Sequence, residues 1–188
     1  MIEPIDLGVC RGYRWQGDPK RVVVVLPGAM LAGMPAVAAP IYALLDRGWS
    51  AVQVWDEFRD RSLDATAWTR ERAEAALAAA GDPDEVVLVA KSLTTRAAGI
   101  AAERSLKAVW LTPLLDDPEC VEMLRARTAP ALLVGGTADP SWDATLAREL
   151  SGDVLELPDA DHGFGGPGGV STLLANLGRV AEAVAAFA

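Results

Sequence analysis

The chain of 188 residues is 51% hydrophobic and 23% charged, which suits one domain, residues 1–188, with a sizeable buried core. Its net charge of −9 would repel phosphate backbones and anionic lipid headgroups, so neither nucleic acid nor a membrane surface is expected as a partner. The two cysteines, Cys10 and Cys120, fit no metal-ligand spacing and predict reduced thiols in a cytoplasmic protein, with a disulfide between them as the alternative.

The first half of the chain predicts a hairpin followed by two strand–helix units. Residues 1–6 lack the basic and apolar regions of a signal peptide. The uncharged stretch 22–45 is long enough for a membrane span, but three prolines and two glycines interrupt it, so we expect a strand, a loop and a helix there. The expected elements are a hairpin over 5–16, strands over 22–26 and 49–55, and helices over 35–48 and 65–80.

The second half continues to alternate short apolar runs with helical patterns. The expected strands cover 86–90, 108–111, 131–135 and 154–157. The expected helices begin at Leu93, cover 118–126 with Asp116 or Asp117 as the cap, extend from a cap at Ser141 to Leu150, and cover 170–187. Strands that alternate with helices in this way form a parallel sheet with helices on both faces. The predicted fold class is therefore α/β, with a mostly parallel sheet.

A serine stands on the sharpest predicted turn of the chain. Only Lys91 and Ser92 separate the strand over 86–90 from the helix that begins at Leu93. A serine placed there has its hydroxyl clear of the sheet, and the helix N-terminus beneath it offers unpaired N–H groups. This is the arrangement of a nucleophile elbow, whose usual pattern is G-x-S-x-G. Here Ala90 and Thr94 replace the glycines, and the alternative for Ser92 is a simple helix N-cap.

The chain holds one histidine, and its position strengthens the interpretation of the serine. A serine hydroxyl is a weak nucleophile until a neighbouring base accepts its proton, so His162 is the candidate base. It follows the strand over 154–157, and Asp139 follows the strand over 131–135 in the segment G-G-T-A-D-P. Three residues of these types, each just past a predicted strand, predict a catalytic triad of Ser92, Asp139 and His162.

The order and setting of these residues resemble the α/β-hydrolase family, and the resemblance extends from Val22 to the C-terminus. The small members of the dienelactone-hydrolase type are the most similar. The resemblance implies an oxyanion hole formed by the backbone N–H of Leu93 and by that of Ala29 or Met30. Some small members carry H-G-A-G-x-G-M in the loop after the first buried strand, where this chain has Pro27 in place of the histidine.

The resemblance also bears on the substrate. Larger members insert a lid after the strand that follows the elbow helix, but here only residues 112–117 separate that strand from the next helix. We therefore expect an open site for a small acyl substrate, with walls from apolar residues at the strand ends. The candidates for these walls are Met30, Trp55, Phe58, Leu114, Trp142 and Phe164.

Several alternatives to these roles stay open. Asp116 is the second candidate for the triad acid, and Asp143, Asp159 and Asp161 are further competitors. Lys91 beside the nucleophile is expected to be solvated or paired with a carboxylate. The string A-K-S is similar to the end of a phosphate-binding P-loop, but β-branched strand residues occupy the positions where that loop needs glycine.

The predicted function is hydrolysis of a small ester or thioester through an acyl-enzyme on Ser92, without a metal or an organic cofactor. One alternative is an acyltransferase or perhydrolase that uses the same triad. The other is a catalytically idle member of the fold that binds a small ligand or a partner protein. The sequence does not indicate the oligomeric state.

Overall fold

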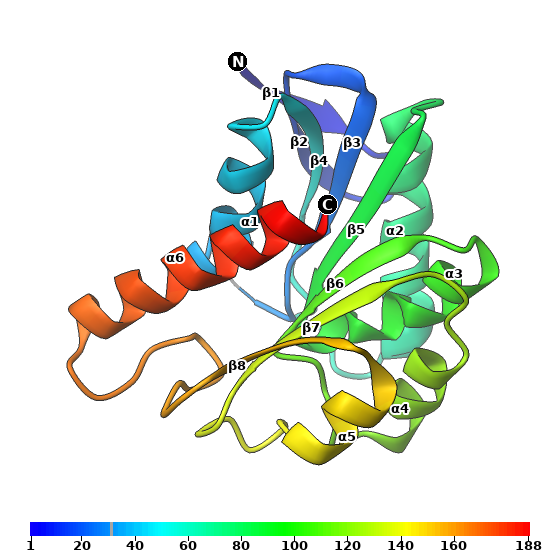
Figure 1. The fold of residues 1–188 in the computed structure, drawn as a ribbon. Helices are drawn as coiled ribbons and strands as arrows, with labels where there is room; N and C mark the ends of the chain where they lie inside the picture. Colours follow the sequence, from blue (N-terminus) through cyan, green and yellow to red (C-terminus); the bar gives the residue numbers. More distant parts are fainter. Residues whose placement is uncertain (31) are drawn as a thin grey trace.

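The computed structural model describes residues 1–30 and 32–188, which form an eight-stranded sheet with helices on both faces (Figure 1). The strands are β1 (Ile2–Asp6), β2 (Arg11–Trp15), β3 (Asp18–Leu26), β4 (Trp49–Trp55), β5 (Glu85–Lys91), β6 (Lys107–Leu111), β7 (Ala131–Gly136) and β8 (Asp153–Leu157). The helices are α1 (Pro35–Leu45), α2 (Ala65–Ala80), the 3₁₀ helix η1 (Ser92–Ala97), α3 (Ala98–Glu103), α4 (Pro118–Arg125), α5 (Ala144–Leu150) and α6 (Val170–Phe187).

The strand order is β1-β2-β4-β3-β5-β6-β7-β8, and the six strands from β3 to β8 run parallel. The hairpin of β1 and β2 adds an antiparallel margin beside β4. The central strands read as continuous apolar runs because side chains on both of their faces are buried. This confirms the predicted mostly parallel α/β sheet and the predicted N-terminal hairpin.

Two hydrophobic clusters lie on opposite faces of the sheet. One face packs against α2, α3, α4 and α5 and includes Trp110 and Leu133. The other face packs against α1 and α6 and includes Val87 and Val89 of β5. The two groups of helices lie on opposite sides of the sheet in Figure 1. Because alternate residues of one strand face opposite clusters, the position of a residue in β5 decides which helices its side chain meets.

Two predicted helix starts are wrong. Ser141 does not cap the helix that ends at Leu150; the helix starts at Ala144, and the Asp143 side chain accepts a hydrogen bond from the N–H of Leu146. A carboxylate suits the positive N-terminal end of a helix better than a hydroxyl does. The segment after the elbow begins as the 3₁₀ helix η1 and becomes α-helical only at Ala98.

Helix α6 is apolar and long enough, at 18 residues, to cross a membrane by length and composition alone. A core helix of a folded domain passes the same test. In this structure one face of α6 packs against the sheet, where Val180 and Val184 are completely buried. Its buried face therefore belongs to the core, although only 22% of the helix is buried.

Candidate active site

Three side chains from distant parts of the chain meet beyond the C-terminal ends of the parallel strands. Ser92 directly follows β5, Asp139 lies in the loop after β7, and His162 lies in the loop after β8. Residues at the C-terminal ends of neighbouring parallel strands lie on the same side of the sheet, which is where open α/β sheets bind ligands. The sheet therefore brings together residues that are 47 and 23 positions apart, at the numbers 92, 139 and 162.

The three side chains form a hydrogen-bonded row. His162 Nε2 is 2.7 Å from Ser92 Oγ, and His162 Nδ1 is 2.7 Å from Asp139 Oδ2. An ionised carboxylate only accepts hydrogen bonds, so Nδ1 of a neutral His162 carries the proton and donates to Asp139. The opposite nitrogen, Nε2, is then left to accept from the Ser92 hydroxyl. The geometry therefore places a base against the serine in the tautomer that can take its proton.

Asp139 is buried but ionised. Burial on its own would raise its pKa, but the hydrogen bonds from His162 and from the Ser141 N–H, with the nearby charge of Lys91, outweigh burial and lower the pKa below its usual value. A carboxylate that stays charged in a buried setting can stabilise positive charge on the imidazole. Asp139 is thus placed to orient the His162 ring and to balance a positive charge on it.

The backbone at Ser92 has the strained conformation of an elbow. Its φ of +55° lies in the left-handed region, which residues with a side chain rarely adopt. Thr94, which stands at the second glycine position of the usual motif, braces this turn through its buried hydroxyl. That hydroxyl accepts a hydrogen bond from the Lys91 N–H and lies 3.0 Å from the Lys91 carbonyl oxygen. Where the usual glycine would allow the backbone to pass closely, Thr94 instead stabilises the turn with hydrogen bonds from its side chain.

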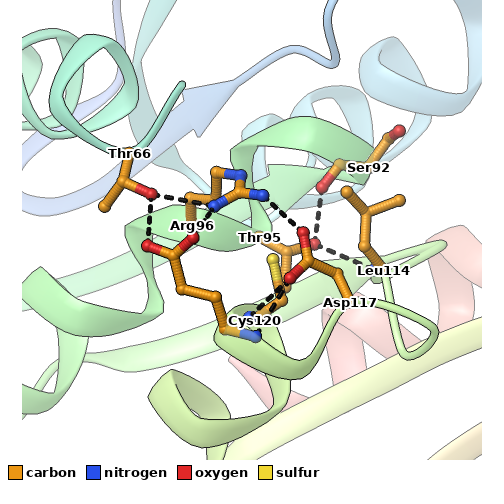
Figure 2. Close-up of polar contacts among 8 residues, drawn as sticks. Thr66, Ser92, Thr95, Arg96, Leu114, Asp117 and Cys120 are labelled. Carbon is orange, nitrogen blue, oxygen red and sulfur yellow. Dashed lines mark hydrogen bonds and ion pairs between the residues drawn. The ribbon is translucent and has the colours of Figure 1, made fainter. Parts of the chain in front are cut away.

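A second group of side chains supports the elbow from behind (Figure 2). The Thr95 hydroxyl donates to the Ser92 carbonyl at 2.6 Å and accepts weakly from the Leu114 N–H at 3.4 Å. The next residue, Arg96, is mostly buried and is paired with Asp117, the N-cap of α4, and with Glu119. These contacts tie η1 to the loop after β6 and to α4, so Ser92 stands on a well-supported turn.

The loop after β3 lies against the elbow. A Cβ atom added to Gly28 would be 3.5 Å from Ser92 Cβ, so this part of the loop passes directly beside the serine. Among the described residues of this loop, the Ala29 carbonyl accepts from the Phe58 N–H and the Ala32 carbonyl accepts from the Gln53 amide. Ala29 is half-buried and Met30 is exposed. The predicted loop over 27–34 includes Leu31, which lies outside the described residues.

A groove of about 700 Å³ opens beside this loop. Its apolar lining includes Ala32, Met34 and Trp55, and its polar lining includes Asp56 and Glu57. The methyl end of Met34 also reaches the loop that carries His162, since it lies 3.9 Å from where a Cβ on Gly163 would be. The groove therefore approaches the histidine loop through Met34, although neither Ser92 nor His162 is among the described residues that line it. Its volume suits a small organic molecule.

The structure contradicts two of the predicted site walls and leaves three others, Leu114, Trp142 and the exposed Met30, outside the lining of the groove. Phe58 is buried with its ring against Trp68, at a centroid separation of 5.2 Å, and Phe164 is completely buried in the core beside α6. Both loops fold back on the core, so their aromatic rings gain more from burial than from lining an open site. The Trp142 ring donates to Glu156 and packs against β7, and Leu114 is half-buried beside Thr95. Trp55 lines the groove.

The competing carboxylates have other partners or positions. Asp161 accepts hydrogen bonds from the N–H groups of Gly163 and Gly165 and so shapes the loop that carries the histidine. Asp143 caps α5, and Asp116 and Asp159 are exposed. Asp139 is the carboxylate that contacts the imidazole.

Solved structures of similar shape cover almost the whole chain. A dienelactone hydrolase from Anabaena variabilis has a TM-score of 0.74 at 18% identity, with 100% of this chain and 97% of that chain covered. An esterase domain from Rhodothermus marinus has a TM-score of 0.72 at 14% identity, with 99% and 97% covered. A serine hydrolase without a lid from Xanthomonas campestris has a TM-score of 0.62 at 15% identity, with 98% and 93% covered.

The chain has the α/β-hydrolase fold. No protein-family model and no curated protein sequence matches it. Sequence identities of 14–18% show the fold alone, so the chemistry of the site has to be argued from its own residues. In this α/β-hydrolase fold the serine, histidine and aspartate occupy the loops after β5, β8 and β7, respectively.

The structure also bears on the two cysteines and on metal binding. Cys10 is half-buried, Cys120 is buried, and both are free thiols. Within residues 1–30 and 32–188, no group of three or more His, Cys, Asp or Glu side chains is arranged to hold a metal ion.

Lys91 is the residue of this site that sequence reasoning missed. The expectation of a solvated or carboxylate-paired side chain is wrong, because Lys91 is 2% exposed and its Nζ donates to Thr112 Oγ1 and to the His162 carbonyl, both at 2.8 Å. Burial lowers its pKa from 10.5 to about 8, although the negative charges of Asp139 and Asp161 oppose the change. Its place at the end of an otherwise apolar strand was the signal available in the sequence.

This buried amine predicts an unusual dependence of stability on pH. The unfolded chain keeps the Lys91 proton up to about pH 10.5, whereas the folded chain releases it near pH 8. Between these values the folded state binds fewer protons, so the free energy of unfolding should gain about 3 kcal/mol from this group as the pH rises. Urea denaturation of the wild type and of Lys91→Met between pH 7 and 10.5 measures the difference. Parallel curves for the two proteins would contradict the assignment.

Proposed function

We propose that this protein is a serine hydrolase that cleaves small esters or thioesters through an acyl-enzyme on Ser92. The observation that carries the proposal is the unbroken row from Ser92 Oγ through the His162 ring to Asp139, with 2.7 Å at each step. The neighbours of similar fold include hydrolases and an esterase domain, which supports hydrolysis in general. The substrate class rests on the groove and the chemistry of the three side chains.

In the proposed mechanism, His162 Nε2 takes the hydroxyl proton as Ser92 Oγ bonds to the substrate carbonyl carbon. Asp139 balances the charge that forms on the imidazole. The proton then passes from Nε2 to the leaving alcohol or thiol when the acyl bond breaks. Water deprotonated by His162 next attacks the acyl-serine, and the same proton returns Ser92 to its starting form.

Negative charge develops on the carbonyl oxygen in both steps, and backbone N–H groups are the proposed donors to it. The N–H of Leu93 lies in the first turn of η1, where helical amides have no acceptor within the helix. The loop beside Gly28 supplies the second donor, from Ala29 or Met30. One such donor contributes on the order of 3 kcal/mol to the rate in enzymes where it has been removed.

The groove beside Trp55 is the proposed site for the acyl or alcohol group of the substrate. The acidic groups that line it are already paired, Asp56 with Arg72 and Glu57 with Arg59, so the groove does not require a cationic ligand. Its apolar surface favours short aliphatic or aromatic groups, and its open side needs no lid to admit them.

Replacing Trp55 with alanine should raise KM for a butyrate or benzoate ester about tenfold and leave kcat nearly unchanged, because the ring supplies apolar contact equally in the bound and reacting states. The acetate ester should be affected less. Tyr42→Ala is the matched control, since Tyr42 is an exposed aromatic side chain on α1 that packs against Trp15. Equal effects of the two substitutions would remove the groove from the proposal.

A fluorophosphonate probe distinguishes this function from the idle-binder alternative. Such a probe phosphonylates a serine only where a base activates the hydroxyl, so one equivalent should add to Ser92 and none to Ser92→Ala. Intact-protein mass spectrometry gives the stoichiometry, and peptide mapping gives the position. A wild-type protein that stays unlabelled would favour a ligand-binding protein. Competing alcohol or peroxide in the ester assay separates hydrolysis from acyl transfer and from perhydrolysis.

A further inference from the structure

The strongest unexplained feature of the site is a lysine buried in the middle of it. Lys91 is the last residue of β5 and shares the face of Val87 and Val89, which lie in the hydrophobic cluster beside α1 and α6. Burying an amine on this face costs more than burying a leucine or methionine of similar size. The contacts of the Lys91 amine should therefore explain why a lysine is buried at this position.

The Lys91 amine joins the end of a strand to the loop that carries the histidine. Its Nζ donates to Thr112 Oγ1 on one side and to the backbone carbonyl of His162 on the other, at 2.8 Å each. Thr112 is completely buried, and its N–H is bonded to the Val134 carbonyl, so it is a fixed anchor. The second bond acts on the main chain of the same residue whose ring bonds Ser92.

The remaining supports of this loop act on neighbouring residues. Asp161 binds the N–H groups of Gly163 and Gly165, and the Asn176 amide donates to the Phe164 carbonyl. These bonds define the turn around the histidine. The hydrogen bond from Lys91 to the His162 carbonyl sets the distance between this turn and the end of β5, where Ser92 begins η1.

We propose that Lys91 is a positioning residue, which holds the His162 main chain so that the imidazole stays within bonding distance of Ser92. This inference rests on the proposed function of Ser92 and His162. Lys91 directly precedes Ser92 in the chain, and its side chain donates a hydrogen bond to the backbone carbonyl of His162. One residue therefore sets the distance between Ser92 and His162. A shift of about 1 Å in such a contact can cost on the order of 100-fold in rate.

The first test compares Lys91→Met with Lys20→Met, a matched change at an exposed lysine near the N-terminal end of β3, paired with Asp84. Lys91→Met should lower kcat about 100-fold with little change in KM, because the groove does not include Lys91. Lys20→Met should behave as wild type. Wild-type kcat in folded Lys91→Met would overturn the proposal.

The single histidine gives a readout that does not depend on turnover. The chain has one imidazole, so its Nδ1 proton, bonded to Asp139, is the one imidazole Nδ1 resonance in the ¹H–¹⁵N spectrum. In Lys91→Met this signal should broaden or move towards that of a free imidazole, and in Lys20→Met it should stay in place. An unchanged signal in Lys91→Met would contradict the proposal even if activity had fallen.

A second pair of variants covers the case in which Lys91→Met does not fold. Thr112→Val replaces the anchoring hydroxyl with a methyl group, and Thr112→Ser keeps the hydroxyl. The valine variant should lose kcat and perturb the imidazole signal, and serine should retain more of both than valine does. Equal losses in the two variants would show that the methyl group matters and would overturn the proposal. Absence of fluorophosphonate labelling in the wild type would instead defeat the proposed function, whatever the spectra show.

Discussion

Replacing His162 with alanine is expected to lower kcat for an activated short-chain ester by about 10⁴-fold or more. The chain has no other histidine, and Ser92 Oγ has its hydrogen bond to Nε2 of this ring, so no second imidazole can take over the proton. The measurement is the steady-state rate on a p-nitrophenyl acetate series, with circular dichroism to show that the variant folds.

The control for His162→Ala is Ser92→Ala, which should lose activity to a similar extent. Residues that act as a unit give losses that do not add, so the double variant should be about as slow as either single one. Independent, multiplying losses would mean that the two side chains do not work together. Activity near that of the wild type in either single variant would defeat the proposed triad.

Replacing Asp139 with asparagine is expected to lower kcat about 10⁴-fold while leaving the fold intact. An amide presents an N–H to the imidazole, which moves the ring proton from Nδ1 to Nε2, and a protonated Nε2 cannot accept the serine proton. The loss should therefore appear in kcat with KM little changed. Rates over a range of ester concentrations at neutral pH measure both.

Asp116→Asn is the matched control for Asp139→Asn. Asp116 follows β6 in the sequence and was the alternative acid, but it is exposed, whereas the Asp139 side chain is 1% exposed and bonded to His162. The Asp116 variant should keep wild-type rates. A large loss in Asp116→Asn together with a small one in Asp139→Asn would assign the acid to the loop after β6.

Much of the fold could be predicted from the sequence because the sheet is parallel and buried. Strands with both faces covered appear as apolar runs, as residues 86–90 do within β5. The run of β4 is interrupted by Ser50 and Gln53, but the strand still begins and ends at the predicted residues, Trp49 and Trp55. Helix α2 was equally predictable, since Asp64 caps it and Gly81 follows its last residue. The start of α5 was not, because Ser141 and Asp143 are both good caps and the choice between them depends on contacts with the Asp139 loop.

The candidate site was predictable only where chain order carries the information. The order of serine, aspartate and histidine after successive strands implied that they meet, because the C-terminal ends of parallel strands share one side of the sheet. The direction of loop side chains carried no such signal. Phe164 lies at the end of a turn shaped by Asp161 and has a φ of +67°. This backbone conformation directs its ring into the core.

The role of Lys91 could not be predicted for a similar reason. Its partners are a hydroxyl 21 residues later and a backbone carbonyl 71 residues later, and neither is visible as a local pattern. Thr94 was visible as a departure from the usual glycine, but the hydrogen bond that its hydroxyl accepts from Lys91 N–H depends on the elbow being formed.

The two outermost strands of the sheet, β1 and β8, carry residues that oppose pairing with the edge of another sheet. β1 has a proline, Pro4, at its centre, which cannot donate to an added strand, and acidic residues, Glu3 and Asp6, on either side of it. β8, at the other margin, carries Asp153 and Glu156. An edge with prolines or charges resists strand-to-strand aggregation, so both margins of the sheet disfavour lateral growth.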